Sequence, residues 1–399
     1  MNLKRMQLKV RFKMFKSLKV KIDKNTQAFF ALLRAGLWEN ILVHDSWFMV
    51  HGSEQVDWEK VYQLAEEQSV VGLVLAGLEH SSVKPPQNLL LQWIGEVQII
   101  EQQNKAMNEF VASLIEKLRE NAVYAILVKG QGIAQCHEKP LWRSSGDVDL
   151  LLSDQNYEIA KSVLLPQAID IENEYKSIKH LGMTMPGDFV VELHGTLHSR
   201  LSTRIDKGID ESQRDVFYNG SVRSWLNDNT QVLLPSPDND VIFIFTHILH
   251  HFYIEGIGLR QICDWCRLLW TYRDSLNPRL LESRIRKMGL TTEWKAFAAF
   301  AIEFLGMPVG AMPLFSEDDS RNHNLRGKAE HILKFILVSG NLGHNLQIAS
   351  SKVGSVWNKM KVFIRHAIIF PMDSIRFFFH FLWNGVELAI NKKKIKIKR

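Results

Sequence analysis

Two aspartates in one predicted strand are the first residues that could carry chemistry. Asp147 and Asp149 lie in the segment RSSGDVDLLL, which ends at Leu152. Side chains alternate along a strand, so two residues that lie two positions apart face the same side. Two adjacent carboxylates repel each other unless a cation lies between them, and hard divalent ions such as Mg²⁺ favour oxygen ligands. The spacing therefore predicts a divalent metal site on this strand.

A third acid lies in a predicted β-hairpin. Segments 178–185 and 189–194 are separated by Pro-Gly-Asp, which is typical of a turn between two antiparallel strands. Glu192 is the acid within the otherwise apolar second arm, FVVELH. A buried carboxylate without a partner is costly. Next to Asp147 and Asp149, Glu192 would gain a partner through a shared metal, so we predict it as the third carboxylate.

A glycine turn precedes the aspartates. Residues 123–128 form a short, uncharged segment that is typical of a buried strand. Gly130 and Gly132 follow and allow backbone turns that a side chain would obstruct. Backbone amides at the start of a helix bind phosphate well. Around this turn and the Ser-Ser-Gly turn before Asp147, we predict a set of nucleotide-binding residues: Lys129, Gly130, Arg143, Ser145 and Gly146.

Basic residues and histidines surround this predicted site. Lys129 and Arg143 could neutralise phosphate, arginine through its planar fork, although Lys129 could also extend from the strand end into solvent. Three hairpin residues are candidates for substrate contact or for a structural role: Lys179, His180 and His194.

Arg260 lies four residues before Asp264 in a predicted helix. Two interpretations stay open for it: a salt bridge within that helix or contact with a bound nucleotide.

Two further patterns resemble metal sites without completing one. His247 and His251 have the i, i+4 spacing of zinc proteins, and His250 lies beside them, but Ile and Leu fill positions 248 and 249, so the glutamate of the HExxH motif is missing. Cys263 and Cys266 form one CxxC in a helical context. We interpret the cysteine pattern as structural. For the histidines, a structural role and a helix that faces a cleft both stay open.

Composition excludes several classes of protein. The net charge is +6, but residues 1–24 hold nine basic residues and one acid, and residues 392–399 hold six basic residues. The chain between them carries 34 basic and 42 acidic residues. This acidic body does not suggest a DNA-binding groove, and we expect no stable DNA binding. Three cysteines, no secretory signal and no apolar run of transmembrane length predict a cytoplasmic protein.

The pattern of elements predicts an α/β (α+β) fold with a small mixed β-sheet, helices on one face of it, and wrapping helical regions. We divide the chain into five parts: 1–24, a basic flexible extension; 25–120, an N-terminal helical region; 121–236, the core with the sheet; 237–391, a C-terminal helical region; and 392–399, a basic tail. Within the core, residues 199–236 are polar and mixed, and we expect a loop-rich crossing there. Two interpretations stay open for the basic tails and for the aromatic segment 365–391. Each could make peripheral contact with anionic lipid. Otherwise, the N-terminal segment would be a mobile extension and the aromatic segment a helix that packs on the body.

The motifs KGQGIAQ, RSSGDVDLLL and VVELH, in this order, resemble the DNA polymerase beta-type nucleotidyltransferase superfamily, and within it an uncharacterised bacterial nucleotidyltransferase family. The likeness extends over residues 56–272, including GIGLRQICDW. It implies that Gly130 begins the turn that holds the nucleotide phosphates, that Asp147 and Asp149 bind two Mg²⁺ (or Mn²⁺) ions, and that Glu192 is the third acid. The superfamily usually has Gly-Ser or Gly-Gly at the turn, whereas Gln131 follows Gly130 here.

The resemblance implies transfer of a nucleoside monophosphate from an NTP, such as ATP, to an acceptor, with release of pyrophosphate. The RSSGD form is also similar to nucleotidyltransferase toxins of abortive-infection systems, so the acceptor stays open among small molecules, sugars, RNA and protein. Two other functions remain as alternatives: a catalytically inactive protein of the same fold that senses nucleotide or binds a partner, and a membrane-associated scaffold that uses both basic tails.

Overall fold

The computed structural model describes residues 23–38, 56–175, 178–254, 256–340, 363–367, 369–371 and 374–378. The predictions for the basic tail at 392–399, for residues 1–22 of the N-terminal extension and for most of the aromatic C-terminal segment lie outside these residues. None of the helices in the described ranges is long and apolar enough to cross a membrane.

A seven-stranded mixed sheet forms the centre of the molecule, in the order β3-β4-β5-β2-β1-β7-β6. β2 pairs with β5 in parallel and with β1 in antiparallel orientation, and β1 pairs with β7 in parallel. The predicted mixed sheet with flanking helical regions is confirmed. The strands are β1 (Ile126–Val128), β2 (Asp147–Leu151), β3 (Asp170–Ile171), β4 (His180–Met185), β5 (Phe189–His194), β6 (Val222–Asn227) and β7 (Thr230–Pro235).

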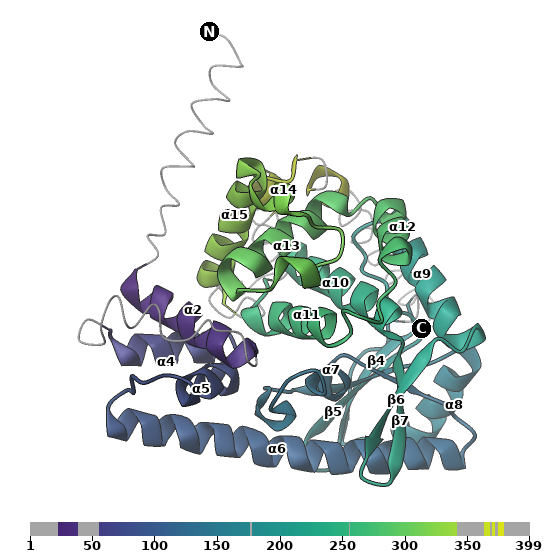
Figure 1. The fold of residues 1–399 in the computed structure, drawn as a ribbon. Coiled ribbons are helices and arrows are strands. Elements are labelled where there is room, and N and C mark those ends of the chain that lie inside the picture. Colours follow the sequence, from purple (N-terminus) through teal and green to yellow (C-terminus); the bar gives the residue numbers. More distant parts are fainter. Residues whose placement is uncertain are drawn as a thin grey trace.

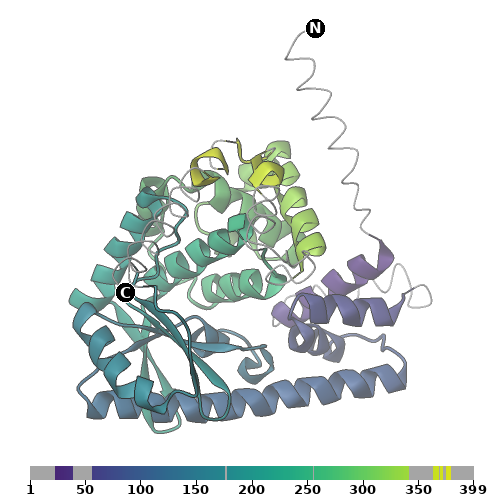
Figure 2. The ribbon, with the colours of Figure 1, turned by 180° about the vertical axis from the view of Figure 1, so that it is seen from behind.

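One long helix, α6 (Gln87–Glu120), underlies the whole structure, as Figures 1 and 2 show. Its buried residues recur every three or four positions, which is the pattern of an amphipathic helix. Trp93 packs in the core of the N-terminal helices α2 (Lys24–Leu37), α4 (Trp58–Glu67) and α5 (Val71–Glu79). Val111 packs instead against the sheet, together with α8 (Asp154–Leu164). The helix thereby connects the N-terminal region to one face of the sheet.

The C-terminal helices lie on the opposite side of the sheet from α6 (Figures 1 and 2). Ile126, Val128 and Leu151 point to this side and join the larger apolar core. Arg34 on α2 donates to the backbone carbonyls of Glu303 and Phe304, which ties the N-terminal helices to α13. The remaining helices are α7 (Gly130–Ala134), α9 (Thr203–Tyr218), α10 (Pro237–Ile254), α11 (Leu259–Thr271), α12 (Pro278–Met288), α13 (Thr291–Leu305), α14 (Glu317–Ser320) and α15 (His323–Ser339), with single 3-10 turns at Pro140–Trp142, Leu165–Gln167 and Val309–Ala311.

The expectation of a loop-rich crossing at residues 199–236 is wrong. This segment contains α9 and the hairpin of β6 and β7. The buried stripe of α9 includes Gly208, Ser212 and Gln213 beside its apolar members, which dilutes the apolar signal. β6 is an edge strand, and Leu226 is exposed on it, so this hairpin also lacks clear alternation.

Candidate functional site

Strand register brings the three predicted carboxylates together. Asp149 lies opposite Glu192 in the parallel β2–β5 pair, and Asp147 lies two residues earlier on the same face. One carboxylate oxygen from each of the three residues lies within 4.8 Å of the others. Val148 and Leu150 point to the other face, where α6 and α8 pack. The convergence that the alternation predicts is present.

The carboxylates line a cavity of about 480 Å³ between the sheet and the C-terminal helices. Lys129, Gly130, Arg143 and Gly146 line it beside β2, and residues 196–200 form another wall. The helices α10 and α11 contribute a set of mostly polar side chains: His247, His250, His251, Arg260, Gln261 and Asp264. The cavity therefore combines carboxylates, cations and imidazoles over the central strands of the sheet.

Asp149 is paired with a lysine and a histidine, whereas the strongest electrostatic influence on Asp147 is another carboxylate, that of Asp149. Lys129 Nζ and His194 Nε2 each lie 2.7 Å from Asp149 Oδ1. Burial opposes the ionisation of Asp149, but Lys129 and His194 together hold its pKa below the ordinary value. Asp149 and then burial raise the pKa of Asp147. A cation bound between the two carboxylates would relieve this repulsion.

Lys129 adopts an uncommon backbone conformation, with φ of 57°. Burial acts against its charge, but Asp149, Asp147 and Glu192 outweigh burial and raise the pKa of Lys129. Gly130 follows with φ of 37°, and a Cβ atom there would lie 3.3 Å from the carbonyl oxygen of Asp147. The turn needs glycine because its backbone packs closely on β2.

Glu192 is held by both histidines of the hairpin. Its Oε2 lies 3.2 Å from His180 Nε2 and 3.3 Å from His194 Nε2. Although burial raises the pKa of Glu192, these two imidazoles hold it well below the ordinary value. Burial likewise opposes the charged form of His194, but hydrogen bonds to Asp149 and Glu192 raise its pKa. Both histidines lie at the carboxylates, as predicted from the hairpin.

Arg143 lies at the cavity but is paired with protein rather than left free for phosphate. Its Nε and Nη2 lie 2.8 Å and 2.7 Å from the two oxygens of Asp264, in a buried bidentate pair. His137 Nε2 lies 2.9 Å from the same carboxylate. Although burial opposes it, Arg143 and His137 hold the pKa of Asp264 well below its usual range. Arg143 Nη1 donates to Ser145 Oγ and to the carbonyl of Ser144, so Arg143 positions the turn before β2.

Arg260 does not form the helix salt bridge that its spacing allowed. Among the described residues, the ion pairs of Asp264 are with Arg143 and His137. Arg260 Nη1 donates to the carbonyl of Ser144 at 2.9 Å, and its buried Nε has no hydrogen-bond partner within the described part of the chain. Burial and then the charge of Arg143 lower the pKa of Arg260. Arg260 is thus a cavity cation that forms no ion pair with a carboxylate of the described residues.

A polar network that sequence reasoning missed fixes the two turns. Ser145 Oγ donates to Gln131 Oε1 at 2.8 Å, and Gln131 Nε2 donates to Asn104 Oδ1 at 3.2 Å. Asn104 on α6 then donates to the carbonyls of Leu141 and Arg143. His137 was missed in the same way, and Asp264 was considered only as a partner of Arg260. Asp264 lies between Cys263 and Trp265, which are both buried. A charged residue at such a position indicates a buried partner of opposite charge.

Other predicted residues are less central. Lys179 Nζ pairs with Asp154 at 2.9 Å and lines a neighbouring cavity instead. His247 and His251 lie 3.1 Å apart between their Nε2 atoms, and His250 Nδ1 lies 2.7 Å from the carbonyl of Ser199. These histidines form a cavity wall. Cys263 and Cys266 are buried free thiols whose pKa values burial raises, which fits a structural role.

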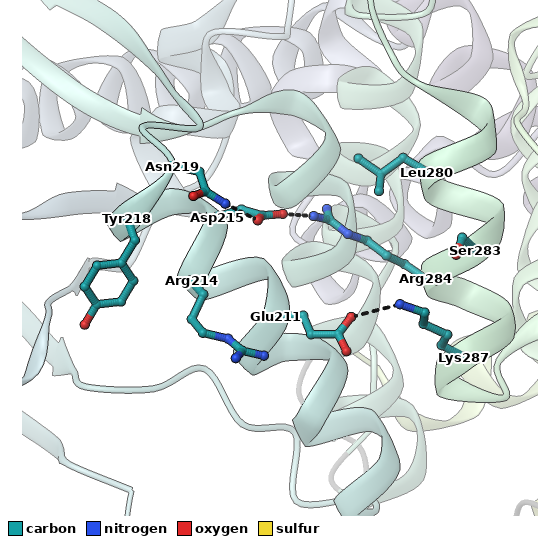
Figure 3. A pocket seen from close by; sticks show the side chains of 9 residues that line it. All are labelled: Glu211, Arg214, Asp215, Tyr218, Asn219, Leu280, Ser283, Arg284 and Lys287. Atoms are coloured by element: carbon teal, nitrogen blue, oxygen red, sulfur yellow. Dashed lines mark hydrogen bonds and ion pairs between the residues drawn. The ribbon is translucent and has the colours of Figure 1, made fainter.

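A second cavity of about 440 Å³ lies between α9 and α12, and Figure 3 shows two pairs of charged side chains that meet across it, with Arg214 beside them. Asp215 pairs with Arg284, and Glu211 Oε2 lies 3.5 Å from Lys287 Nζ. These charges neutralise each other, and none of the three converging carboxylates lines this cavity.

Comparison with known proteins identifies a family for this chain. A family model described as "uncharacterised nucleotidyltransferase" matches residues 54–306, more than half of the chain. No curated protein matches. Among solved structures, the chain is similar to an antigenic nucleotidyltransferase-like protein from Paracoccidioides brasiliensis, with 16% identity and a TM-score of 0.30 over 50% of this chain and 92% of that one.

Proposed function

The chain belongs to the family of uncharacterised nucleotidyltransferases, and from this premise we propose that it transfers a nucleoside monophosphate from an NTP to an acceptor and releases pyrophosphate. The observation that carries the proposal is the convergence of Asp147, Asp149 and Glu192 in a cavity that also holds Lys129 and Arg260. The strand–turn–helix before β2 and the D-x-D on β2 support a place in the DNA polymerase beta-type superfamily.

The carboxylates fit a hard divalent cation. Oxygen donors are the ligands that Mg²⁺ and Mn²⁺ favour, and the raised pKa of Asp147 reports repulsion that such an ion would relieve. Asp147, Asp149 and Glu192 would hold the metal. When bound, it would stabilise charge on the transferring phosphoryl group and favour ionisation of the acceptor hydroxyl.

The cations of the cavity would bind the triphosphate. Lys129 stays protonated because three carboxylates surround it, and its ammonium could exchange Asp149 for a phosphate oxygen. Arg260 is the arginine better placed for phosphate, since Arg143 is committed to Asp264. Arg143 would act on the nucleotide through Ser145 and Gly146, whose turn it holds.

Glu192 is the residue that would take the proton from the acceptor hydroxyl. Its carboxylate is ionised and half-buried, and it faces the cavity between two imidazoles. A carboxylate of such low pKa is a weak base, so Glu192 could accept a proton only from an acceptor hydroxyl whose ionisation a bound metal favours. His194, which contacts both Glu192 and Asp149, would orient these carboxylates.

Nucleotide-dependent labelling tests the proposal. The purified protein is incubated with each α-labelled NTP, Mg²⁺ or Mn²⁺, and a lysate of its own host. An Asp147→Ala/Asp149→Ala variant removes the carboxylates, and Glu211→Gln in the α9–α12 cavity is the matched control. We expect label on RNA, protein or a small molecule with wild type and Glu211→Gln alone, and the labelled fraction identifies the acceptor class. Absence of label with every NTP, with nucleotide binding unchanged in the double variant, would refute transfer and favour nucleotide sensing.

A further inference from the structure

The β4–β5 hairpin presents a second set of metal ligands beside the three carboxylates. His180 lies directly opposite His194 across the hairpin, and Glu192 lies two residues before His194, so all three point to the same face. One potential ligand atom from each residue lies within 4.8 Å of the other two. Glu192 belongs to this set and to the carboxylate set as well.

The spacing of the ligand atoms suits a bound transition metal. Both imidazoles direct Nε2 at one oxygen, Glu192 Oε2, at 3.2 Å and 3.3 Å. A tetrahedral zinc ion with bonds of about 2.0–2.2 Å to nitrogen and oxygen separates its ligand atoms by about 3.3–3.5 Å. The two observed distances from Nε2 to Glu192 Oε2 are close to this value without any rearrangement of the hairpin.

Two carboxylates share one ring nitrogen in this arrangement. His194 Nε2 faces two carboxylates, Asp149 Oδ1 at 2.7 Å and Glu192 Oε2 at 3.3 Å, and a ring nitrogen carries at most one hydrogen. The imidazoles of His180 and His194 lie 4.8 Å apart between ring centres. Two nitrogens and one carboxylate oxygen thus converge on one small volume at the edge of the cavity.

We propose that His180, Glu192 and His194 form a second metal site for a borderline divalent transition ion such as Zn²⁺. Two imidazoles and one carboxylate are a common ligand set for such ions, whereas Mg²⁺ prefers oxygen alone. Glu192 is the ligand that this site shares with Asp147 and Asp149. The inference rests on the proposed function only through this shared residue, and its test measures metal binding without nucleotide.

Metal-binding measurements on the full-length protein test the site. Metal-depleted protein is titrated with Zn²⁺ alone in competition with a chromogenic chelator. We expect His180→Gln to weaken the tightest Zn²⁺ binding by at least about 100-fold, because loss of a direct ligand should exceed the effect of losing an outer partner. Asp147→Asn should retain this binding. The matched control is His198→Gln, which changes a histidine of the same cavity that pairs with Asp210 outside the proposed set and should behave as wild type.

A spectroscopic measurement gives an independent answer. Pulsed electron paramagnetic resonance of the protein loaded with Cu²⁺ alone, as a paramagnetic substitute for Zn²⁺ that favours imidazole, should show coupling to imidazole nitrogen, reduced in His180→Gln. Circular dichroism checks that the variants fold, and if His180→Gln does not, the nitrogen coupling of wild type decides. Equal Zn²⁺ affinity in wild type and His180→Gln, loss of that affinity in Asp147→Asn with retention in His180→Gln, or absence of nitrogen coupling would each overturn the proposal. A failure to transfer nucleotide would leave these measurements unaffected.

Discussion

The carboxylate cavity and the α9–α12 cavity have similar volumes, about 480 Å³ and 440 Å³, and both are lined by charged side chains. They differ in how the charges are arranged. In the α9–α12 cavity each acid faces a base on the opposite helix, as Figure 3 shows for Asp215 with Arg284 and Glu211 with Lys287. In the carboxylate cavity three acids face one another, and Lys129 pairs with Asp149 while Asp147 and Glu192 also act on its charge.

This difference separates a structural use of charge from a chemical one. Ion pairs between two helices help to hold the helices together. Because their charges are opposite, they leave little net electrostatic field in the cavity between the helices. Like charges gathered on one strand face cost folding free energy, and a protein tolerates that cost where a ligand offsets it. Volume alone would not distinguish the two cavities, whereas the signs and directions of their side chains do.

The largest expected effect of a single substitution is on transfer. Asp149→Asn keeps the size of the side chain but removes one metal ligand and the ion pair to Lys129. We expect the rate of label incorporation to fall by at least about 10³-fold, the scale of losing a main electrostatic contact to the transition state. Glu211→Gln should stay within about twofold of wild type. Comparable losses in both variants would mean that the two cavities do not differ as proposed.

The buried pair of Arg143 and Asp264 should dominate stability. Asp264→Ala leaves a buried guanidinium without its carboxylate, and breaking a buried pair in this way costs about 3–5 kcal/mol. Urea denaturation followed by circular dichroism measures the loss in free energy of unfolding. Lys287→Ala, which removes an exposed partner at 3.5 Å, is the matched comparison and should cost far less. Equal costs would show that Asp264 is not the central support of the turn before β2.

The same pair predicts a pH dependence of stability. The pKa of Asp264 is lower in the folded protein than its ordinary value of 3.8, so the ionised carboxylate contributes stability above about pH 4. This contribution is lost as the pH falls through the folded pKa. The difference in free energy of unfolding between wild type and Asp264→Asn should therefore narrow from pH 6 to pH 3. A constant difference over this range would contradict the ionised pair.

The sheet side of the site could be predicted because strand geometry is local. Alternation places Asp147 and Asp149 on one face, and the same rule places Glu192 and His194 together on β5. A turn of three residues then sets the register that brings His180 opposite His194. A few consecutive residues determine each of these relations.

The helical side could not be predicted in the same way. His137 and Arg143 lie more than 100 residues from Asp264 in sequence, and only the packing of α11 against the turn before β2 brings them together. The fixed spacing in the chain suggested Arg260 as the partner of Asp264 instead. Tertiary packing decided between the two arginines, because the planar fork of Arg143 matches both carboxylate oxygens inside the protein.

The smallest expected effect concerns Glu211 and Lys287 as a pair. Both side chains are largely exposed, at 44% and 65%, and their closest atoms are 3.5 Å apart. A double-mutant cycle with Glu211→Gln and Lys287→Gln should give a coupling below about 0.5 kcal/mol in urea denaturation, because water screens such pairs. Label incorporation should be unchanged in all three variants. A coupling above about 1 kcal/mol would show that water does not screen this pair. A tenfold loss of transfer would mean that this cavity takes part in the reaction, for example by binding the acceptor.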